Sequence, residues 1–157
     1  MLHLIPAPLH RALLPLAHRL RRRWRQWRKV PLAGCSVIVT RIDGAVLLVR
    51  HSYGSGHWSL PGGGIGRGEP PEASARRELH EELGLEPYRM ALVGVLEETV
   101  SGSFHTAHLF HCVVDREPVI DRREVIEARF FPTHSLPEPL SAITRRRLEM
   151  WRGSQER

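Results

Sequence analysis

Segment 62–84 has the most restrictive local sequence in the chain. It begins with Gly62-Gly63-Gly64 and reaches Pro70-Pro71, which precede a run without glycine or proline that lasts until Gly84. Proline is tolerated in the first turn of a helix, and glycine suits the left-handed position just after the last turn. The sequence therefore predicts a glycine-rich loop that leads directly into a helix ending before Gly84.

Three glutamates of this helix share one strip of its surface. With Glu78 as the origin and about 100° per residue, Glu82 lies about 40° to one side and Glu81 about 60° to the other. Neighbouring carboxylates repel one another and raise one another's pKa unless a cation is present. The apolar residues of the adjoining strip, which would hold the helix on a core, are Ala75, Leu79 and Leu83. Hard oxygen ligands on such a rigid support suit Mg²⁺ or Mn²⁺.

Two interpretations of this acidic helix remain open. It could be a solvated acidic face, eased by the neighbouring Arg76 and Arg77. The glycine run directly upstream favours a ligand site instead, because glycine lets main-chain groups approach a ligand closely. Carbonyl groups of that run could join the carboxylates on a metal, and its N–H groups could meet a phosphate.

The same residues match a known motif. In chain order they are Gly63, five residues, Glu69, seven residues, Arg77-Glu78-Leu79, one residue, Glu81-Glu82, one residue and Gly84-Leu85. This pattern resembles the Nudix box, G-x5-E-x7-R-E-U-x-E-E-x-G-U with U a bulky aliphatic residue, without any departure. The flanking stretches 46–50, 58–64 and 127–132 are also similar to the family. The resemblance extends over about residues 32–151.

The resemblance implies an α/β fold class, with an α/β/α sandwich around a mixed β-sheet. It implies a Nudix hydrolase domain over 31–157 that cleaves the pyrophosphate bond of a nucleoside diphosphate linked to another moiety. Its cofactor would be Mg²⁺, for which Mn²⁺ could substitute. A divalent ion lowers the pKa of bound water and stabilises the leaving oxygen in such a reaction.

The resemblance also assigns roles within the box. The catalytic and metal-binding residues would be Glu78, Glu81, Glu82 and Arg77, helped by the carbonyl of Gly63 or Gly64. Arg77 would orient the acids through ion pairs, and Glu78 could relay a proton from the attacking water. Which glutamate acts as the base stays open, because coupled acids titrate as a unit. Glu69 and Gly84 would support the structure of the box.

Residues outside the conserved spacing of the box extend the candidate site. Arg50 could contact phosphate, pair with a box glutamate or be solvated at a strand end. Trp58 could stack on a base or pack against the glycine loop. Gly62 and Gly64 would present main-chain groups to the substrate. Glu98 could be an extra metal ligand or a simple strand-end acid.

The rest of the chain alternates between strand and helix signals. Strands are expected at 33–40 and 45–50, joined by a turn at Asp43-Gly44, with a brief strand at 58–61. Further strands are expected at 90–97, 104–114 and 128–131, and a last helix at 141–151 with Ser141 as its N-cap.

The first 30 residues carry a net charge of +8 and the remaining 127 a net charge of −2, since all 17 acidic residues lie after residue 30. The basic residues there are Arg11, Arg19, Arg21, Arg22, Arg23, Arg25, Arg28 and Lys29. Leu13, Leu16, Leu20, Trp24 and Trp27 recur at helical spacing. The pattern predicts a separate basic amphipathic helix over 1–30. It could lie on the following domain or a second subunit of a homodimer, or bind nucleic acid or an anionic membrane surface.

Other sequence features narrow the class of protein. No 18-residue apolar run occurs. Two cysteines, Cys35 and Cys112, are too few for a disulfide framework and favour a reducing, cytoplasmic compartment. The substrate stays open among nucleoside triphosphates, nucleotide sugars, ADP-ribose, dinucleoside polyphosphates and capped RNA. The alternative function is a non-catalytic nucleotide-binding or regulatory module, although retention of mutually repelling carboxylates argues against it.

Overall fold

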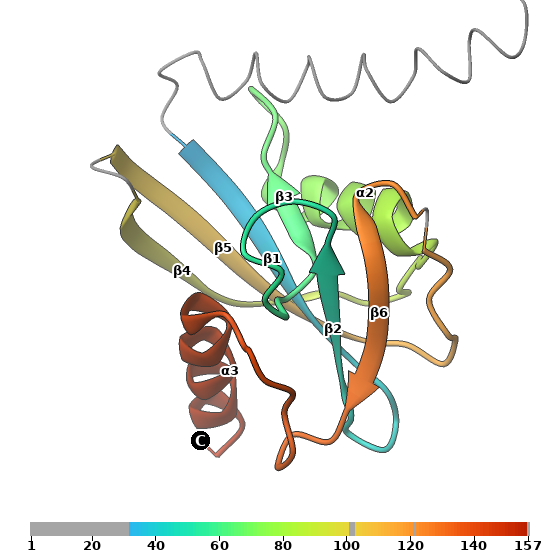
Figure 1. Ribbon diagram of the computed structural model, residues 1–157. Helices are drawn as coiled ribbons and strands as arrows, with labels where there is room; N and C mark the ends of the chain where they lie inside the picture. The colour runs from blue at the N-terminus through green and yellow to red at the C-terminus, as the bar shows by residue number, and fades with distance from the viewer. Residues whose placement is uncertain (1–31, 101–102, 121, 157) are drawn as a thin grey trace, which may run out of the picture. The chain divides into compact units, whose positions relative to one another are not determined.

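The structure, a computed structural model, describes residues 32–100, 103–120 and 122–156 (Figure 1). All of them belong to the unit Pro31–Arg157. The helix predicted over 1–30, with the partners expected for it, lies outside the described residues.

Six strands and two helices make up the described part of the chain. The strands are β1 Leu32–Thr40, β2 Val46–His51, β3 Gly62–Gly64, β4 Ala91–Val100, β5 Ser103–Val113 and β6 Val125–Phe131, and the helices are α2 Pro71–Leu83 and α3 Ala142–Gln155. The strands form one sheet in the order β4-β5-β1-β2-β6, with β3 paired to β1. Strands β1 and β5 are parallel, and the other pairs are antiparallel. The sheet is therefore mixed, as expected.

Alternate residues of β1 supply two cores on opposite faces of the sheet. Val37 and Val39 pack in one cluster with Leu79 of α2. Ile38 packs in the other with Leu148 of α3. The two helices thus cover opposite faces of the sheet (Figure 1). This arrangement confirms the predicted α/β/α sandwich, because successive side chains of a strand point to opposite faces.

The predicted turn, both ends of α2 and the start of α3 are confirmed, whereas α3 continues to Gln155, beyond the predicted end at 151. Gly44 adopts a left-handed conformation, with φ of 81°, in the turn between β1 and β2. Helix α2 starts at Pro71, and Gly84 follows it with φ of 63°. The hydroxyl of Ser141 accepts the backbone N–H of Thr144 and caps α3. Local signals were sufficient for these features because each depends on only a few neighbouring residues.

The brief strand expected at 58–61 is placed differently in the structure. Trp58 and Ser59 make only isolated bridges, and the strand is Gly62–Gly64. The run can pair with β1 because it lacks side chains: a Cβ on Gly62 would lie 2.2 Å from the carbonyl oxygen of Cys35. Close approach of two backbones therefore overrides the low strand propensity of glycine.

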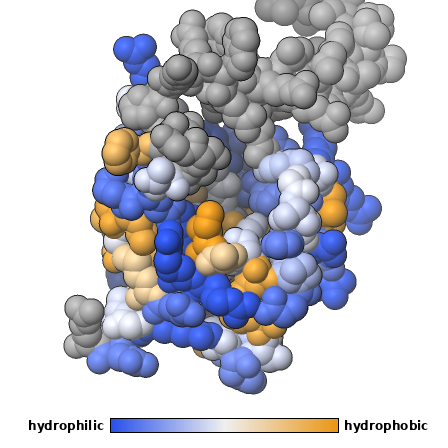
Figure 2. Space-filling view, turned by 60° about the vertical axis from the view of Figure 1, so that its left-hand side comes forward, coloured by the Kyte–Doolittle hydropathy of each residue, from blue (hydrophilic) through white to orange (hydrophobic). Residues whose placement is uncertain are grey.

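The outer surface of this unit is mixed in polarity. On the face shown in Figure 2, small apolar patches lie between hydrophilic residues. Among the described helices, none has the length and apolar character needed to cross a membrane.

Candidate active site

Strand β3 brings the glycine run against the acidic side of α2. A Cβ added to Gly63 would lie 2.6 Å from the carboxyl carbon of Glu78, so this carboxylate rests directly on the main chain of Gly63. The N–H of Gly62 donates to Oε2 of Glu82 at 3.4 Å. Two of the three predicted carboxylates therefore contact the loop that the sequence placed next to them.

Arg77 bonds to several residues of the box. Its Nε and Nη2 donate to the two oxygens of Glu69 at 2.8 and 3.1 Å. Its Nη1 donates to Glu78 at 2.7 Å and reaches Glu81 at 3.5 Å. Nη2 also donates to the carbonyl oxygen of Gly64 at 3.3 Å. One guanidinium thus joins the loop, the bracing acid and two candidate metal ligands, consistent with the orienting role expected for it.

The three box glutamates occupy different environments. The side chain of Glu78 is 13% exposed, that of Glu81 is 52% exposed, and Glu82 is buried. Burial raises the pKa of Glu78, and the hydrogen bond from Arg77 opposes this rise. Because burial disfavours the charged form, Glu78 accepts a proton more readily than a solvated carboxylate does.

Glu69 is held in its charged form. The hydrogen bond from Arg77 lowers the pKa of Glu69 to about 2, helped by the N–H of Gly66, which donates to Glu69 at 2.8 Å. Above a pH of about 2 the carboxylate is therefore charged, and it joins the loop at Gly66 to α2. This position agrees with the bracing role that the resemblance implies.

Two further residues of the site were not singled out from the sequence. The hydroxyl of Ser74 donates to the carbonyl of Gly64 at 3.2 Å, and the thiol of Cys35 donates to that of Gly63 at 3.6 Å. Ser74 lies one helical turn before Glu78, so its spacing was a usable signal. Cys35 gave no local signal, because it reaches the loop only through the pairing of β1 with β3.

The residues of the box suit a hard divalent cation in their chemistry. Glu78 and Glu81 share one nitrogen of Arg77, so positive charge is already accommodated between them. Glu82 instead meets the N–H of Gly62. Accordingly, over 32–100, 103–120 and 122–156, no three His, Cys, Asp or Glu side chains converge as a metal-holding group. The carboxylate oxygens fit Mg²⁺ or Mn²⁺, and two of the acids, Glu78 and Glu81, pair with the cation of Arg77 in the structure.

Two candidates outside the box positions, Arg50 and Trp58, contact residues other than the box acids. Arg50 pairs with Glu127 at 3.2 Å and donates to the carbonyl of Gly56 at 3.1 Å, rather than bonding to a box glutamate. Trp58 is buried and packs edge-on against Phe131, with ring centroids 5.0 Å apart. Packing, rather than an open stacking surface, is therefore the observed role of Trp58.

Glu98 is bound by the last helix. Its side chain is only 7% exposed, and its carboxylate pairs with Arg146 and, at 3.0 Å, with Arg147 of α3. Nδ1 of His105 lies 3.9 Å from the same carboxylate. The acid that could have been an extra metal ligand is thus neutralised by two arginines.

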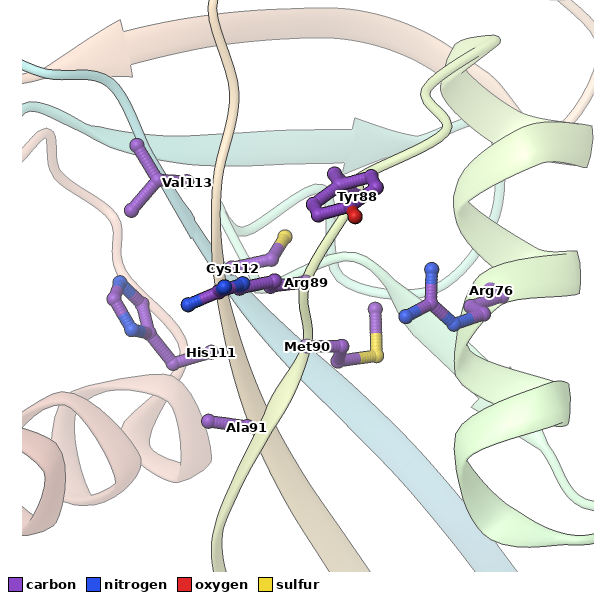
Figure 3. Close-up of a pocket in the computed structure, with 8 residues that line it drawn as sticks. All are labelled: Arg76, Tyr88, Arg89, Met90, Ala91, His111, Cys112 and Val113. Carbon is purple, nitrogen blue, oxygen red and sulfur yellow. The ribbon is translucent and has the colours of Figure 1, made fainter.

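Two cavities lie near these elements. The larger, of about 680 Å³, is lined by Arg76 of α2 and by Tyr88, Arg89 and Met90, with residues of β5 across from them (Figure 3). It contains no carboxylate, so it lacks the chemistry of the box. The smaller, of about 270 Å³, is lined by Gly62–Gly64 together with residues of β1, His105 and Arg147. The smaller cavity therefore adjoins the loop that carries the candidate chemistry.

Comparisons with solved structures agree with this geometry. A MutT NUDIX hydrolase from Burkholderia pseudomallei has a TM-score of 0.69 and 30% identity, with 78% of this chain and 98% of that chain covered. The NUDIX domain of Shewanella oneidensis NrtR, complexed with ADP ribose, has a TM-score of 0.71 at 19% identity, covering 88% and 97%. The second likeness concerns the fold alone.

Curated relatives match a shorter stretch. An RNA pyrophosphohydrolase of Pseudoalteromonas translucida is 39% identical over 61 residues, which are 39% of this chain and 35% of the relative. One from Aeromonas hydrophila is 43% identical over 51 residues, 32% of this chain and 29% of the relative. The alignments thus span about a third of the length of these relatives.

The family comparison covers most of the chain. The NUDIX domain matches residues 30–151, which include the whole glycine loop, α2 and the sheet. The box spacing, the sandwich fold and this match lead to one conclusion: the chain belongs to the Nudix family.

Proposed function

We propose that this protein is a divalent-metal-dependent hydrolase of a pyrophosphate bond in a nucleoside diphosphate linked to another moiety. The observation that carries the proposal is the contact of Glu78 with Gly63, on a helix that also bears Glu81 and Glu82. The match to the NUDIX domain supports this reaction class.

Each residue of the box has a task in this reaction. Glu78, Glu81 and Glu82 would hold Mg²⁺ or Mn²⁺, together with the carbonyl of Gly63 or Gly64. When bound, the ion lowers the pKa of the attacking water and offsets charge on the phosphate oxygens. Glu78, whose pKa is raised by burial, can accept the proton of that water.

Arg77 and Glu69 keep the carboxylates in place during the reaction. The two bonds between them fix the guanidinium, which in turn fixes the oxygen of Glu78 at 2.7 Å. A fixed acid loses little free energy to reorganisation when charge develops on the phosphate.

The substrate belongs to the nucleotide class in this proposal. Relatives are named RNA pyrophosphohydrolase, which favours a test with RNA that carries a 5′-triphosphate beside free nucleotides. The buried free thiols of Cys35 and Cys112 support a reducing, cytoplasmic location.

A hydrolysis screen tests the reaction. Release of phosphate or pyrophosphate is measured from nucleoside triphosphates, nucleotide sugars, ADP-ribose, dinucleoside polyphosphates and 5′-triphosphorylated RNA, with Mg²⁺ or Mn²⁺. Glu81→Gln and Glu82→Gln should each lower kcat at least about 100-fold while the melting temperature changes little. Glu72→Gln is the matched control, because Glu72 lies on the same helix and pairs with Arg76 at 2.9 Å.

The non-catalytic alternative makes the opposite prediction. A binding module would take up nucleotide with no turnover, and Glu81→Gln would leave that uptake intact. Full hydrolytic rates in both glutamine variants would show that the metal-binding assignment is wrong.

A further inference from the structure

The hydroxyl of Ser74 joins the acidic helix to the glycine strand. Strand β3, which carries the glycine run, lies beside α2 (Figure 1). Ser74 of α2 is fully buried, and its hydroxyl donates to the carbonyl oxygen of Gly64 at 3.2 Å. The hydroxyl accepts a hydrogen bond from Nη2 of Arg77 at 3.2 Å, and the same nitrogen donates to the carbonyl of Gly64 at 3.3 Å. The Gly64 carbonyl is therefore held by two donors of the helix.

The direction of this hydrogen bond distinguishes Ser74 from an ordinary helical serine. A serine hydroxyl inside a helix commonly donates back to a carbonyl of the preceding turn. The hydroxyl of Ser74 instead donates to the neighbouring strand. Alanine is the better helix former and buries no polar group, so α2 itself does not require a hydroxyl at this position. The contribution of the hydroxyl therefore concerns the position of the glycine strand.

Cys35 supports the same junction from β1. It lies opposite Gly63 in the pairing of β1 with β3. Its sulfur lies 3.6 Å from the carbonyl oxygen of Gly63 and 3.8 Å from the hydroxyl oxygen of Ser74. The thiol has one hydrogen to donate, and both acceptors belong to this junction. Because a thiol is a weak donor, we expect Cys35 to contribute less than Ser74.

The junction sets the distance between the glycine carbonyls and the acids. Glu78 follows Ser74 by one helical turn, so both side chains leave the same face of α2. Glu78 rests on the main chain of Gly63, while Ser74 is bonded to the carbonyl of Gly64. Two neighbouring contacts thus fix the strand on the helix. A shift of the strand would move its carbonyls relative to the carboxylates, and Mg²⁺ demands near-ideal octahedral geometry from its ligands.

We propose that Ser74 is a positioning residue of the metal site, because it holds the glycine carbonyls at a fixed distance from the box carboxylates, and that Cys35 is a second, weaker one. The inference rests on the proposed function, which supplies the divalent ion. Neither side chain would touch the ion. Removal of a group that orients metal ligands typically lowers metal affinity roughly 10- to 100-fold.

Metal binding tests the inference without any substrate. Binding of Mn²⁺ to the full chain is measured by titration calorimetry in the wild type and in variants at both positions. We expect Ser74→Ala to raise the Kd for Mn²⁺ about tenfold. Ser74→Cys keeps a side chain of similar shape with a weaker donor, so its Kd should lie between those of the wild type and Ser74→Ala. Cys35→Ala should raise the Kd less than Ser74→Ala does.

Thr40→Val is the matched control for loss of a buried hydroxyl. Thr40 is the last residue of β1, it is buried, and its hydroxyl is hydrogen-bonded to Nε2 of His111 at 3.0 Å. Thr40 and His111 make none of the contacts that hold the glycine strand on α2. We therefore expect Thr40→Val to lower the melting temperature about as much as Ser74→Ala does and to leave the Kd for Mn²⁺ unchanged.

Three outcomes would overturn the inference. They are an unchanged Kd in Ser74→Ala, an equal rise of the Kd in Thr40→Val, and a wild type that binds no Mn²⁺. Hydrolysis is a separate readout. A protein that loses Mn²⁺ affinity in Ser74→Ala but not in Thr40→Val, and that hydrolyses no nucleotide, would keep this inference and refute the proposed reaction. An active hydrolase with the same Mn²⁺ affinity in every variant would do the opposite.

Discussion

At the scale of single residues, the absence of a side chain at Gly63 is as important as the presence of one at Glu78. The carboxylate occupies the space that a Cβ would fill, at 2.6–2.7 Å. Because it ends a flexible side chain, the carboxylate can move aside without disturbing the backbone. The position of the Glu78 carboxylate therefore depends on the absence of a side chain at Gly63. The fold does not depend on it.

Gly63→Ala should separate activity from folding. We expect kcat/KM to fall about 100-fold, because a displacement of about 1 Å in a catalytic group has this effect. The melting temperature should change little. Gly64→Ala is the control, since nothing lies within 4 Å of a Cβ built at that position. Equal loss of activity in both variants would contradict the assignment of Gly63.

Glu69→Gln should reduce stability in a pH-dependent way. The pKa of Glu69 is lowered from 4.5 to about 2 in the folded state, chiefly by its hydrogen bond from Arg77. The ion pair therefore stabilises the fold above pH 4.5, and this contribution is lost as the pH falls through about 2. We expect the variant to be about 1–2 kcal/mol less stable at pH 7, with the difference vanishing near pH 2.

Urea unfolding between pH 2 and pH 7 measures this difference. Glu72→Gln, which breaks an exposed pair with Arg76, should cost only a few tenths of a kcal/mol. A constant difference between wild type and Glu69→Gln across this range would exclude the ion pair as its cause.

At the scale of elements, both ends of α2, the start of α3 and the hairpin of β1 with β2 were predictable, whereas the pairing of strands far apart in the sequence was not. Pro71, Gly84 and Ser141 act through their own backbones or nearest neighbours, so local rules identified them. The parallel register of β1 with β5 joins residues such as Leu32 and His105, which are far apart in sequence. No local pattern records the pairing of strands so far apart in sequence, so that part of the sheet needed the structure.

The glycine that follows α2 and the glycine within α3 should respond oppositely to substitution by alanine. Gly84 follows α2 with φ of 63°, so Gly84→Ala should cost about 1 kcal/mol of unfolding free energy. Gly153 lies within α3, and nothing is within 4 Å of its Cβ position. Gly153→Ala should raise the free energy of unfolding by a few tenths to about 1 kcal/mol. Urea unfolding of both variants measures the change in the free energy of unfolding. Changes of the same sign in the two variants would contradict the assignment of the left-handed cap.

At the scale of the whole molecule, the site is assembled from segments that span most of the described chain. The spacing of the box was enough to select its acids, Arg77 and Glu69 as candidates, and their catalytic roles stay a prediction. The cavity beside them is completed by Arg147 of the last helix and His105 of β5. These residues carry no motif, because their relation to the box exists only after both faces of the sheet are covered.

The two cysteines should report on global unfolding. Both are buried and free, and desolvation by burial raises the pKa of Cys35 and brings that of Cys112 to about 12. The reactive thiolate is therefore scarce in the native protein. Neither thiol should react with Ellman's reagent until denaturant unfolds the sheet, when both should react. Rapid reaction of one thiol in the native protein would reveal local opening of its core.

Arg77 also gives the protein an internal counter-ion. It already lies between Glu69, Glu78 and Glu81, so folding does not have to wait for an ion from solution to neutralise these acids. Chelation of the metal should therefore abolish activity without lowering the melting temperature. Adding the ion back should restore activity within the mixing time. A protein arranged in this way can stay folded in its inactive, metal-free form when the concentration of metal in the cell fluctuates.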